Sequence, residues 1–275
     1  MLDETHDRTS LLERFAAQFR MQLVNDSKIP LYYQLARIMV RFIRETGIAP
    51  DDQFPSEDSI AVCFEVSQPT VGKAIQVLLD QGLLQRIRGK GTFVQEDSRV
   101  EFALLSETMS PAEQFPPEAL ASRLIDRRTV EVFPKVAREL GIQVGSEALF
   151  LRRLRTYNDI PLLVCDSVLP RERFPRLGEE PFVRGSLYAT LEERYDCPIL
   201  YSKRYVEASE LIDNQIAELL RIPHFSPVLL LRGTAHTVGE EPVESITSVF
   251  REGLRLASTV ERNPARPQSS SAHTS

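Results

Sequence analysis

Three cations in one short segment are spaced so that they can bind the phosphates of a nucleic acid. The three cations, Arg86, Arg88 and Lys90, occupy alternate positions. Gly89 lies between Arg88 and Lys90, and Gly91 follows Lys90. Alternation is the period of a β-strand and glycines favour a tight turn, so the segment predicts a β-hairpin with a basic tip. Basic side chains bind a phosphate backbone through their charge. The alternative interpretation is a solvated hairpin tip without a ligand.

The residues before this hairpin predict a helix whose first turn can contact DNA. Ser67 can cap the helix, Pro69 is tolerated in its first turn, and Gly82 ends it. The hydroxyls of Ser67 and Thr70 can hydrogen-bond phosphates at the helix N-terminus, where the helix dipole favours anions. Gln68 can form a bidentate pair with adenine. The candidate DNA-contacting residues are Ser56, Ser67, Gln68, Thr70, Lys73, Arg86, Arg88, Gly89, Lys90 and Gly91.

A second group of polar residues lies in the C-terminal half. Arg153 and Arg155 lie two positions apart in LFLRRLRTY, which places both on one face of a predicted strand. Ser186 opens a predicted helix that also carries Tyr188, so two hydroxyls and backbone N–H groups lie near the start of that helix. The alternatives are a strand edge with charges paired to carboxylates, an ordinary helix cap at Ser186 and a core position for Tyr188.

Histidine and cysteine form no recognisable catalytic or metal-binding pattern. The four histidines and three cysteines contain no HxxxH, HxH or CxxC spacing, and an odd number of cysteines argues against a disulfide framework. We therefore expect no catalytic residue, no metal and no cofactor. The alternative class is an enzyme in which His224, His236 and Asp166 perform acid–base chemistry.

Length and charge limit the class of protein. The chain has 275 residues, enough for two ordinary domains, and a formal net charge of −6. A chain of this charge does not coat nucleic acid over its whole surface, so any contact with DNA must be local. The sequence has no apolar run of about 18 residues that could span a membrane. Its acidic, polar N-terminus does not resemble a secretory signal, so we expect a cytoplasmic protein.

Three helices are expected to position the basic hairpin. Pro30 begins the first, whose apolar residues recur at helical spacing until Gly47 ends it. Ser56 caps a short second helix, and the helix that begins at Ser67 follows after a tight turn. Two short helices joined in this way, with a support helix before them and a hairpin after them, predict a winged helix-turn-helix.

The C-terminal half predicts an antiparallel sheet with helices beside it. Six runs, mostly rich in β-branched or aromatic residues, are strand-like, and three helices interrupt them. One helix runs from Pro134 to Gly141, one is capped by Ser186, and one is capped by Ser209 with Ile212 on its apolar face. Several consecutive strands with few helices predict an α+β domain.

Together these segments resemble the GntR family of bacterial transcription regulators, in the HutC-like branch with a UTRA effector domain. PLYYQLARIMVRFI, FPSEDSIA, VSQPTVGKAI and LLDQGLLQRIRGKGTFV are similar to the family's DNA-binding domain. LRRLRTYNDIPLLVCDSVLP, GSLYATLEERY and PVESITSVFREGLR are similar to the UTRA pattern. The resemblance implies an α+β chain: an N-terminal winged helix-turn-helix and a C-terminal, chorismate-lyase-like antiparallel sheet with flanking helices.

Five segments are predicted along the chain. Residues 1–27 are an N-terminal extension, either an amphipathic helix or a frayed tail, and residues 28–94 are the winged helix-turn-helix. Residues 95–117 combine charge and proline without a sustained period and are expected to be a linker. Residues 118–257 are the UTRA domain, and the polar residues 258–275 are expected to be a disordered tail.

The resemblance also implies roles for particular residues. In UTRA relatives the pair that corresponds to Arg153 and Arg155 helps to bind an anionic group of the effector, and the groups at the start of the Ser186 helix could meet the same anion. The effector-binding positions that the resemblance implies are Arg153, Arg155, Cys165, Ser186, Tyr188, Glu244, Phe250 and Arg251. Asp58, Gln68 and Gly72 stand where family members usually carry arginine, and Cys165 stands where they commonly carry glutamate.

We therefore expect a ligand-responsive transcription repressor that binds a palindromic, double-stranded DNA operator as a homodimer, with a small anionic metabolite as effector and no membrane partner. The alternative is a small-molecule sensor whose helix-turn-helix has lost sequence-specific DNA binding.

Overall fold

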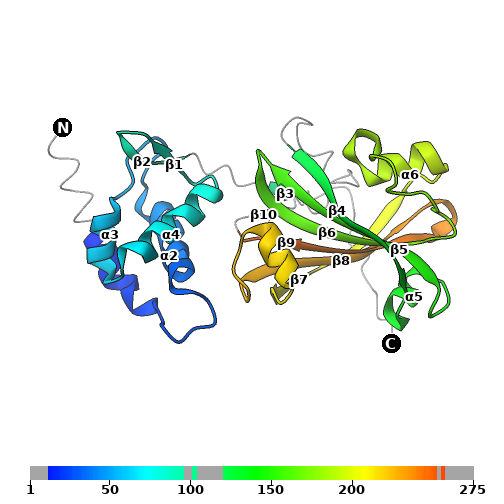
Figure 1. Ribbon diagram of the computed structural model, residues 1–275, viewed down its shortest axis with the longest axis horizontal. Helices are drawn as coiled ribbons and strands as arrows, with labels where there is room; N and C mark the ends of the chain where they lie inside the picture. The colour runs from blue at the N-terminus through cyan, green and yellow to red at the C-terminus, as the bar shows by residue number, and fades with distance from the viewer. Residues whose placement is uncertain (1–11, 96–100, 104–119, 253–254, 258–275) are drawn as a thin grey trace, which may run out of the picture.

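The computed structural model describes residues 12–95, 101–103, 120–252 and 255–257. They form two lobes, an N-terminal one of helices with a small hairpin and a C-terminal one around a large sheet (Figure 1). The predicted tail, 258–275, and most of the predicted linker lie outside the described residues. Within the linker, β3 (Glu101–Ala103) pairs in parallel with β10 (Arg255–Ala257).

The N-terminal lobe contains the three expected helices. An apolar stripe on the first is buried, including Leu35 and Phe42, and Gly47 ends this helix in the left-handed conformation with φ +71°. The Ser56 hydroxyl caps the second helix by accepting a hydrogen bond from the backbone N–H of Ser59 at 3.1 Å. The helices are α2 (Leu31–Thr46), α3 (Glu57–Phe64) and α4 (Gln68–Asp80).

The described part of the N-terminal extension is also helical. Residues 12–19 form a helix, followed by the 3-10 turn η1 (Arg20–Gln22). Leu12, Phe15 and Phe19 are buried, and the Phe15 ring lies 5.0 Å from that of Phe42 in an edge-to-face contact. The extension therefore contributes to the same apolar core as α2 to α4.

A two-stranded hairpin follows α4. Strands β1 (Leu84–Ile87) and β2 (Gly91–Val94) are antiparallel, and Ile87 lies opposite Gly91, so residues 88–90 form the turn. Gly89 and Gly91 have φ values of +75° and +116°, which residues with a Cβ rarely adopt. The winged helix-turn-helix predicted from the sequence is confirmed.

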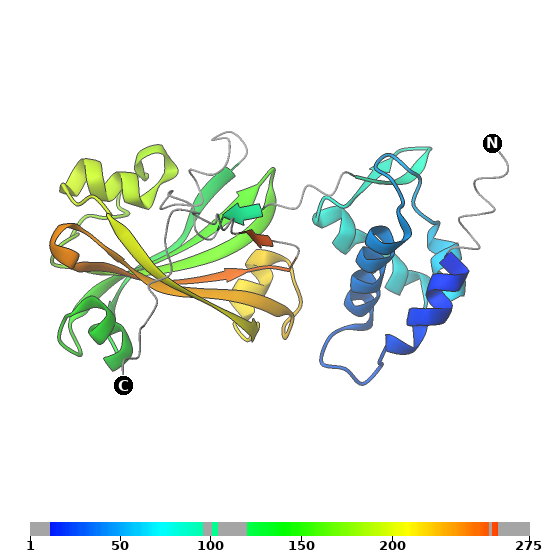
Figure 2. The ribbon, with the colours of Figure 1, turned by 180° about the vertical axis from the view of Figure 1, so that it is seen from behind.

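The C-terminal lobe is built on a six-stranded antiparallel sheet with the order β4-β5-β6-β9-β8-β7. Successive residues of a strand point to opposite faces, so each face has its own apolar layer. Helices α5 and α7 pack on one face and α6 on the other (Figures 1 and 2). The predicted α+β architecture is confirmed. The elements are β4 (Leu120–Glu131), α5 (Pro134–Leu140), β5 (Glu147–Tyr157), β6 (Ile160–Pro170), η3 (Val183–Gly185), α6 (Leu187–Tyr195), β7 (Tyr201–Glu210), α7 (Asn214–Leu220), β8 (Pro227–His236), η4 (Val238–Glu240) and β9 (Pro242–Phe250).

Two interpretations of this half of the sequence are wrong. Ser209, the predicted helix cap, lies within β7, and α7 begins later, where the Asp213 carboxylate accepts a hydrogen bond from the N–H of Ile216 at 3.0 Å. Pairing of β7 with β8 continues to Glu210 and overrides the local helix pattern. The arginines of β5 are not strand-edge charges, because β5 lies between β4 and β6.

The two lobes touch at the N-terminus of α2. Tyr33 is fully buried and belongs to the same apolar cluster as Leu220 of α7. Arg37 of α2 lies 3.6 Å from the Glu252 carboxylate, and the Lys28 ammonium group lies 4.9 Å from the centre of the Phe225 ring. The start of α2 is therefore in contact with residues just beyond the end of β9.

Candidate functional site

The first part of the candidate DNA-binding surface is the start of α4. Gln68 and Lys73 are exposed on α4, and Ser56 is exposed at the start of α3. Ser67 is the N-cap residue of α4, but its hydroxyl contacts the Thr70 hydroxyl at 2.8 Å and no backbone N–H. The predicted cap position is therefore correct, while the hydroxyl pair differs from an ordinary side-chain cap.

The hairpin provides the second part of this surface. Arg86 on β1 and Arg88 and Lys90 in the turn are exposed. Arg86 donates to the Glu57 carboxylate of α3 at 2.8 Å. The wing is therefore connected to the N-terminus of α3 by an ion pair of two partly exposed side chains, a kind of pair worth at most about 1 kcal/mol.

The N-terminus of α3 also contacts the start of α4. The Gln68 amide nitrogen donates a hydrogen bond to the Asp58 carboxylate. Glu57 and Asp58 thus each hold one candidate DNA-contacting side chain. A Cβ at Gly72 would lie 3.5 Å from the Glu57 carboxylate, an ordinary contact, so the protein itself does not require glycine there.

A pocket opens on the α6 face of the sheet in the C-terminal lobe. Arg153 and Arg155 project into it from β5 and are 3% and 4% exposed. Burial and the neighbouring Arg153 lower the pKa of the Arg155 guanidinium to about 10. Two buried cations side by side favour an anion between them. The lining residues are Arg153, Arg155, Leu163, Cys165, Leu187, Tyr188, Arg204, Leu231, Glu244, Ile246, Ser248 and Phe250.

One carboxylate lies among these cations. Glu244 is 1% exposed, and its Oε1 lies 3.6 Å from Nη2 of Arg153. Burial and the Glu244 carboxylate raise the pKa of Tyr188 well above its ordinary value, so its hydroxyl stays protonated and can donate a hydrogen bond. Three arginines and one glutamate in the lining leave an excess of positive charge.

Several buried polar atoms of the pocket have no hydrogen-bond partner within the described part of the chain. They are Nε of Arg153, Nη1 of Arg155 and Oε2 of Glu244. Leaving such atoms unmatched costs about 1–3 kcal/mol each, and more for charged groups. A molecule that accepts from the arginines and donates to the glutamate would satisfy all three.

Cys165 lines the pocket beside Arg153. Its sulfur is 3.5 Å from Nη2 of Arg153, which also donates to the Ser167 hydroxyl at 2.7 Å. Cys165 is 7% exposed and supplies only a weak hydrogen-bonding group.

Two of the predicted effector-binding residues lie elsewhere. Ser186 caps α6, accepting from the N–H of Ala189 at 3.3 Å, as its alternative interpretation stated. The buried Arg251 donates to the carbonyl of Pro161 at 3.2 Å and contributes to the charge environment of Tyr33 at the contact between the lobes.

The sequence missed one cation of the pocket. Arg204 reaches the lining from β7, which is separated from β5 by three strands. The segment that contains it was predicted to be a strand, but nothing in the sequence indicates that this strand and β5 contribute to the same pocket.

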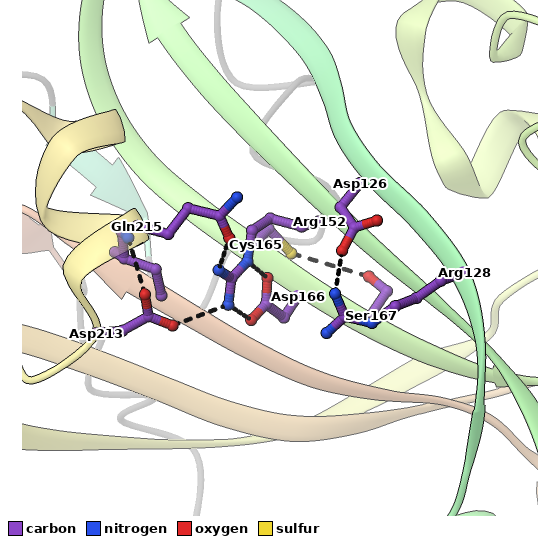
Figure 3. A network of polar contacts seen from close by, with 9 residues as sticks. Asp126, Arg128, Arg152, Cys165, Asp166, Ser167, Asp213 and Gln215 are labelled. Carbon is purple, nitrogen blue, oxygen red and sulfur yellow. Dashed lines mark hydrogen bonds and ion pairs between the residues drawn. The ribbon is translucent and has the colours of Figure 1, made fainter.

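Arg152 lies on the opposite face of β5 and is fully partnered (Figure 3). It forms hydrogen bonds of 2.8 and 2.7 Å with the two carboxylate oxygens of Asp166, and it also contacts Asp213 at 3.2 Å and the Gln215 amide oxygen. The bond to Asp166 raises the pKa of Arg152 above its ordinary value. This network connects the sheet to α7. Asp166 is paired with Arg152 on this face of the sheet and is not one of the residues that line the pocket.

Other site types have no support in the described residues. They contain no group of three or more His, Cys, Asp or Glu side chains arranged to hold a metal ion. No helix among them combines the length and apolar character needed to cross a membrane.

Both lobes match known families. Residues 31–94 match bacterial regulatory proteins of the gntR family, and residues 118–253 match the UTRA domain. The chain is 33% identical over 236 residues to the HTH-type transcriptional repressor NagR of Bacillus subtilis, which covers 84% of this chain and 94% of NagR. It is 30% identical over 234 residues to the probable fructoselysine utilization operon transcriptional repressor of Escherichia coli K12, with the same coverage of both chains.

A solved structure supports the same fold. The crystal structure of PhnF from Mycobacterium smegmatis aligns with a TM-score of 0.55 at 24% identity, covering 83% of this chain and all of that one. Both of these relatives, NagR and the fructoselysine operon regulator, are named as transcriptional repressors and not as enzymes. The chain belongs to the GntR family of bacterial transcription regulators and carries a UTRA domain as its C-terminal lobe.

Proposed function

We propose that this protein is a repressor that binds a palindromic DNA operator as a homodimer and responds to a small anionic metabolite. Its relatives NagR and the fructoselysine operon regulator are repressors, which supports the same direction of control here. Residues 28–94 would form the DNA-binding domain and residues 118–257 the effector domain. A DNA partner in a bacterial cell is consistent with a cytoplasmic location, which is part of this proposal.

The observation that carries the effector proposal is a set of buried polar atoms in the pocket that have no hydrogen-bond partner among the described residues. Arg153 and Arg155 offer donors to an anionic group, and Glu244 offers an acceptor to a hydroxyl or ammonium group. Leucine, isoleucine and phenylalanine side chains complete the wall. The preferred ligand is therefore a small anion that also carries a hydrogen-bond donor, with a partly apolar body.

Few residues separate the pocket lining on β9 from the residues that contact the DNA-binding domain. Ser248 and Phe250 line the pocket from β9, and the two residues that follow, Arg251 and Glu252, approach α2. A ligand that shifts the end of β9 would change the packing around Tyr33. Such a change would alter the position of the DNA-binding domains relative to each other, and with it the affinity for two half-sites.

On the DNA side, Gln68 replaces a family arginine and is oriented by Asp58. We propose that it reads adenine in the major groove while Arg88 and Lys90 contact phosphates. A homodimer doubles these contacts and compensates for a weak half-site.

A second candidate function is supported by the same contacts. Glu57 and Asp58 engage Arg86 and Gln68, and both acids repel a phosphate backbone. A protein whose helix-turn-helix no longer reads sequence would be a metabolite sensor that acts through other contacts.

Selection of bound sequences from a random duplex pool separates the two functions. We would use the full-length chain and a variant with Arg86, Arg88 and Lys90 replaced by alanine, each at two salt concentrations. A repressor should enrich a two-fold symmetric motif that the variant fails to enrich. Absence of any enriched motif from a folded wild-type protein would contradict operator reading and favour the sensor.

A further inference from the structure

The strongest nucleophile in the lining of the effector pocket is the thiol of Cys165. This residue lies on β6 directly opposite Arg153 in the antiparallel register of β5 and β6, and both side chains line the pocket. The sulfur atom, yellow in Figure 3, is 3.5 Å from Nη2 of Arg153 and 4.0 Å from the Ser167 hydroxyl. A thiol is a weak hydrogen-bonding group but an intrinsically strong nucleophile. What Cys165 adds to this pocket is therefore covalent chemistry.

The two arginines beside the thiol indicate one group of the molecule with which it reacts. Arg153 and Arg155 are each more than nine-tenths buried, and the former has an Nε and the latter an Nη1 without a hydrogen-bond partner among the described residues. The planar guanidinium group matches the geometry of a carboxylate. Because the sulfur of Cys165 lies so close to the guanidinium of Arg153, a carboxylate bound there brings the carbon next to it within reach of the sulfur.

A buried acceptor indicates a second group. Glu244 also lines the pocket, is more than nine-tenths buried, and has an Oε2 without a partner among the described residues. A carboxylate oxygen in this position accepts a hydrogen bond from a hydroxyl group. The pocket therefore suits a molecule that has a carboxylate, an electrophilic carbon next to it, and an oxygen on that carbon which becomes a hydroxyl. These are the features of a 2-oxo acid.

We infer that Cys165 binds a small 2-oxo acid through a reversible covalent bond. The inference rests on the proposed effector function of this pocket and names the class of effector. The sulfur attacks the carbonyl carbon next to the carboxylate, a C–S bond forms, and the π bond of the C=O group breaks. The thiol proton moves to the carbonyl oxygen, and the hydroxyl formed in this way donates to Glu244. The same steps in reverse release the acid, so occupancy of the site follows the concentration of the acid.

The other two cysteines lack these surroundings. Cys63 lies in the N-terminal lobe, where burial raises the pKa of its thiol and so lowers the fraction of nucleophilic thiolate. The sulfur of Cys197 is 3.7 Å from Nη2 of Arg173, but Arg173 is also 3.2 Å from the Glu241 carboxylate. Of the three thiols, that of Cys165 alone lines the pocket with the unmatched arginine atoms. The other two remain in a Cys165 variant and serve as controls within the same chain.

A matched pair of acids tests the covalent bond. Glyoxylate has an aldehyde carbon next to its carboxylate, whereas glycolate has the same size and charge but a hydroxyl on a saturated carbon. We would measure the affinity of both acids for the full-length wild type and for Cys165→Ser by calorimetry. The wild type should bind glyoxylate at least about tenfold more tightly than glycolate, and Cys165→Ser should bind the two about equally. A preference of the same size in Cys165→Ser would overturn the role of Cys165.

Carbon-13 magnetic resonance shows the bond in the wild type itself, so this test does not depend on the folding of a variant. Glyoxylate labelled at the aldehyde carbon should give a signal of a carbon bonded to both sulfur and oxygen, and Cys165→Ser should not give it. Absence of this signal from the wild type, or equal affinities for the two acids, would overturn the covalent bond. Binding of inorganic phosphate in that case would leave the anion pocket intact. If neither acid nor phosphate binds, the proposed effector pocket is wrong, and this inference with it.

Discussion

Arg155 and Arg152, three positions apart on β5, should respond in opposite ways when each is replaced by methionine. Arg155 is 4% exposed, lies beside Arg153, and has an Nη1 without a hydrogen-bond partner among the described residues. Its pKa is lowered to about 10 by burial and by Arg153, so the charged form is less favourable in the folded protein than in the unfolded chain. A shift of this size corresponds to roughly 3 kcal/mol, a cost that is fully present at neutral pH. Arg155→Met should therefore raise the free energy of unfolding by about 1–3 kcal/mol.

Arg152 faces the other side of the sheet and is matched by carboxylates. Its guanidinium forms two hydrogen bonds with Asp166 and a third contact with Asp213. Removing it leaves Asp166 largely buried without a counter-ion. Arg152→Met should lower the free energy of unfolding by about 3–5 kcal/mol.

Urea denaturation of the full-length variants, followed by circular dichroism because the chain has no tryptophan, measures both effects. Inorganic phosphate, used as a simple anion, should raise the melting temperature of the wild type and have a smaller effect on Arg155→Met. A loss of more than about 1 kcal/mol in Arg155→Met without ligand would refute the reasoning, because it would mean that Arg155 is already compensated within the folded chain.

Three further outcomes are expected. Asp58→Ala should leave folding unchanged but relax the base preference at the position read by Gln68. The expected loss is about 1–3 kcal/mol of discrimination between bases, which sequence selection can measure. If the variant selects the same motif as the wild type, Asp58 does not orient Gln68. Tyr33→Ala should destabilise the contact between the lobes by about 3–5 kcal/mol. Tyr33→Phe removes a buried hydroxyl that has no partner at hydrogen-bond distance among the described residues, so it should be neutral or stabilising in the same denaturation assay. Burial alone would raise the pKa of Asp213, but the hydrogen bond from the Ile216 N–H and the charge of Arg152 lower this pKa below its ordinary value. The ionised Asp213 carboxylate therefore stabilises the fold at neutral pH, and this stabilisation disappears as the pH falls through the folded-state pKa. Asp213→Asn should therefore be less stable than wild type at pH 7, and the two melting temperatures should converge as the pH falls below the ordinary pKa of an aspartate; a constant difference would contradict this.

Features that depend on neighbouring residues could be predicted from the sequence. Gly47 ends a helix, Ser56 caps one, and Gly89 permits a turn because of backbone and side-chain geometry within a few positions. The spacing of apolar residues then defined the helix-turn-helix and its wing. The strand that carries Arg153 and Arg155, with both side chains on one face, follows from the same local rules.

The tertiary structure decided which distant elements meet. Arg204 joins the arginines of β5 only because β6, β9 and β8 complete the sheet between their strands. Ser209 became part of β7 and Ile212 is 74% exposed, because pairing with β8 outweighed a local helix pattern. Strand order and pairing depend on contacts between residues far apart in the chain. Local propensity carries no information about them, so the composition of the pocket could be identified only from the fold.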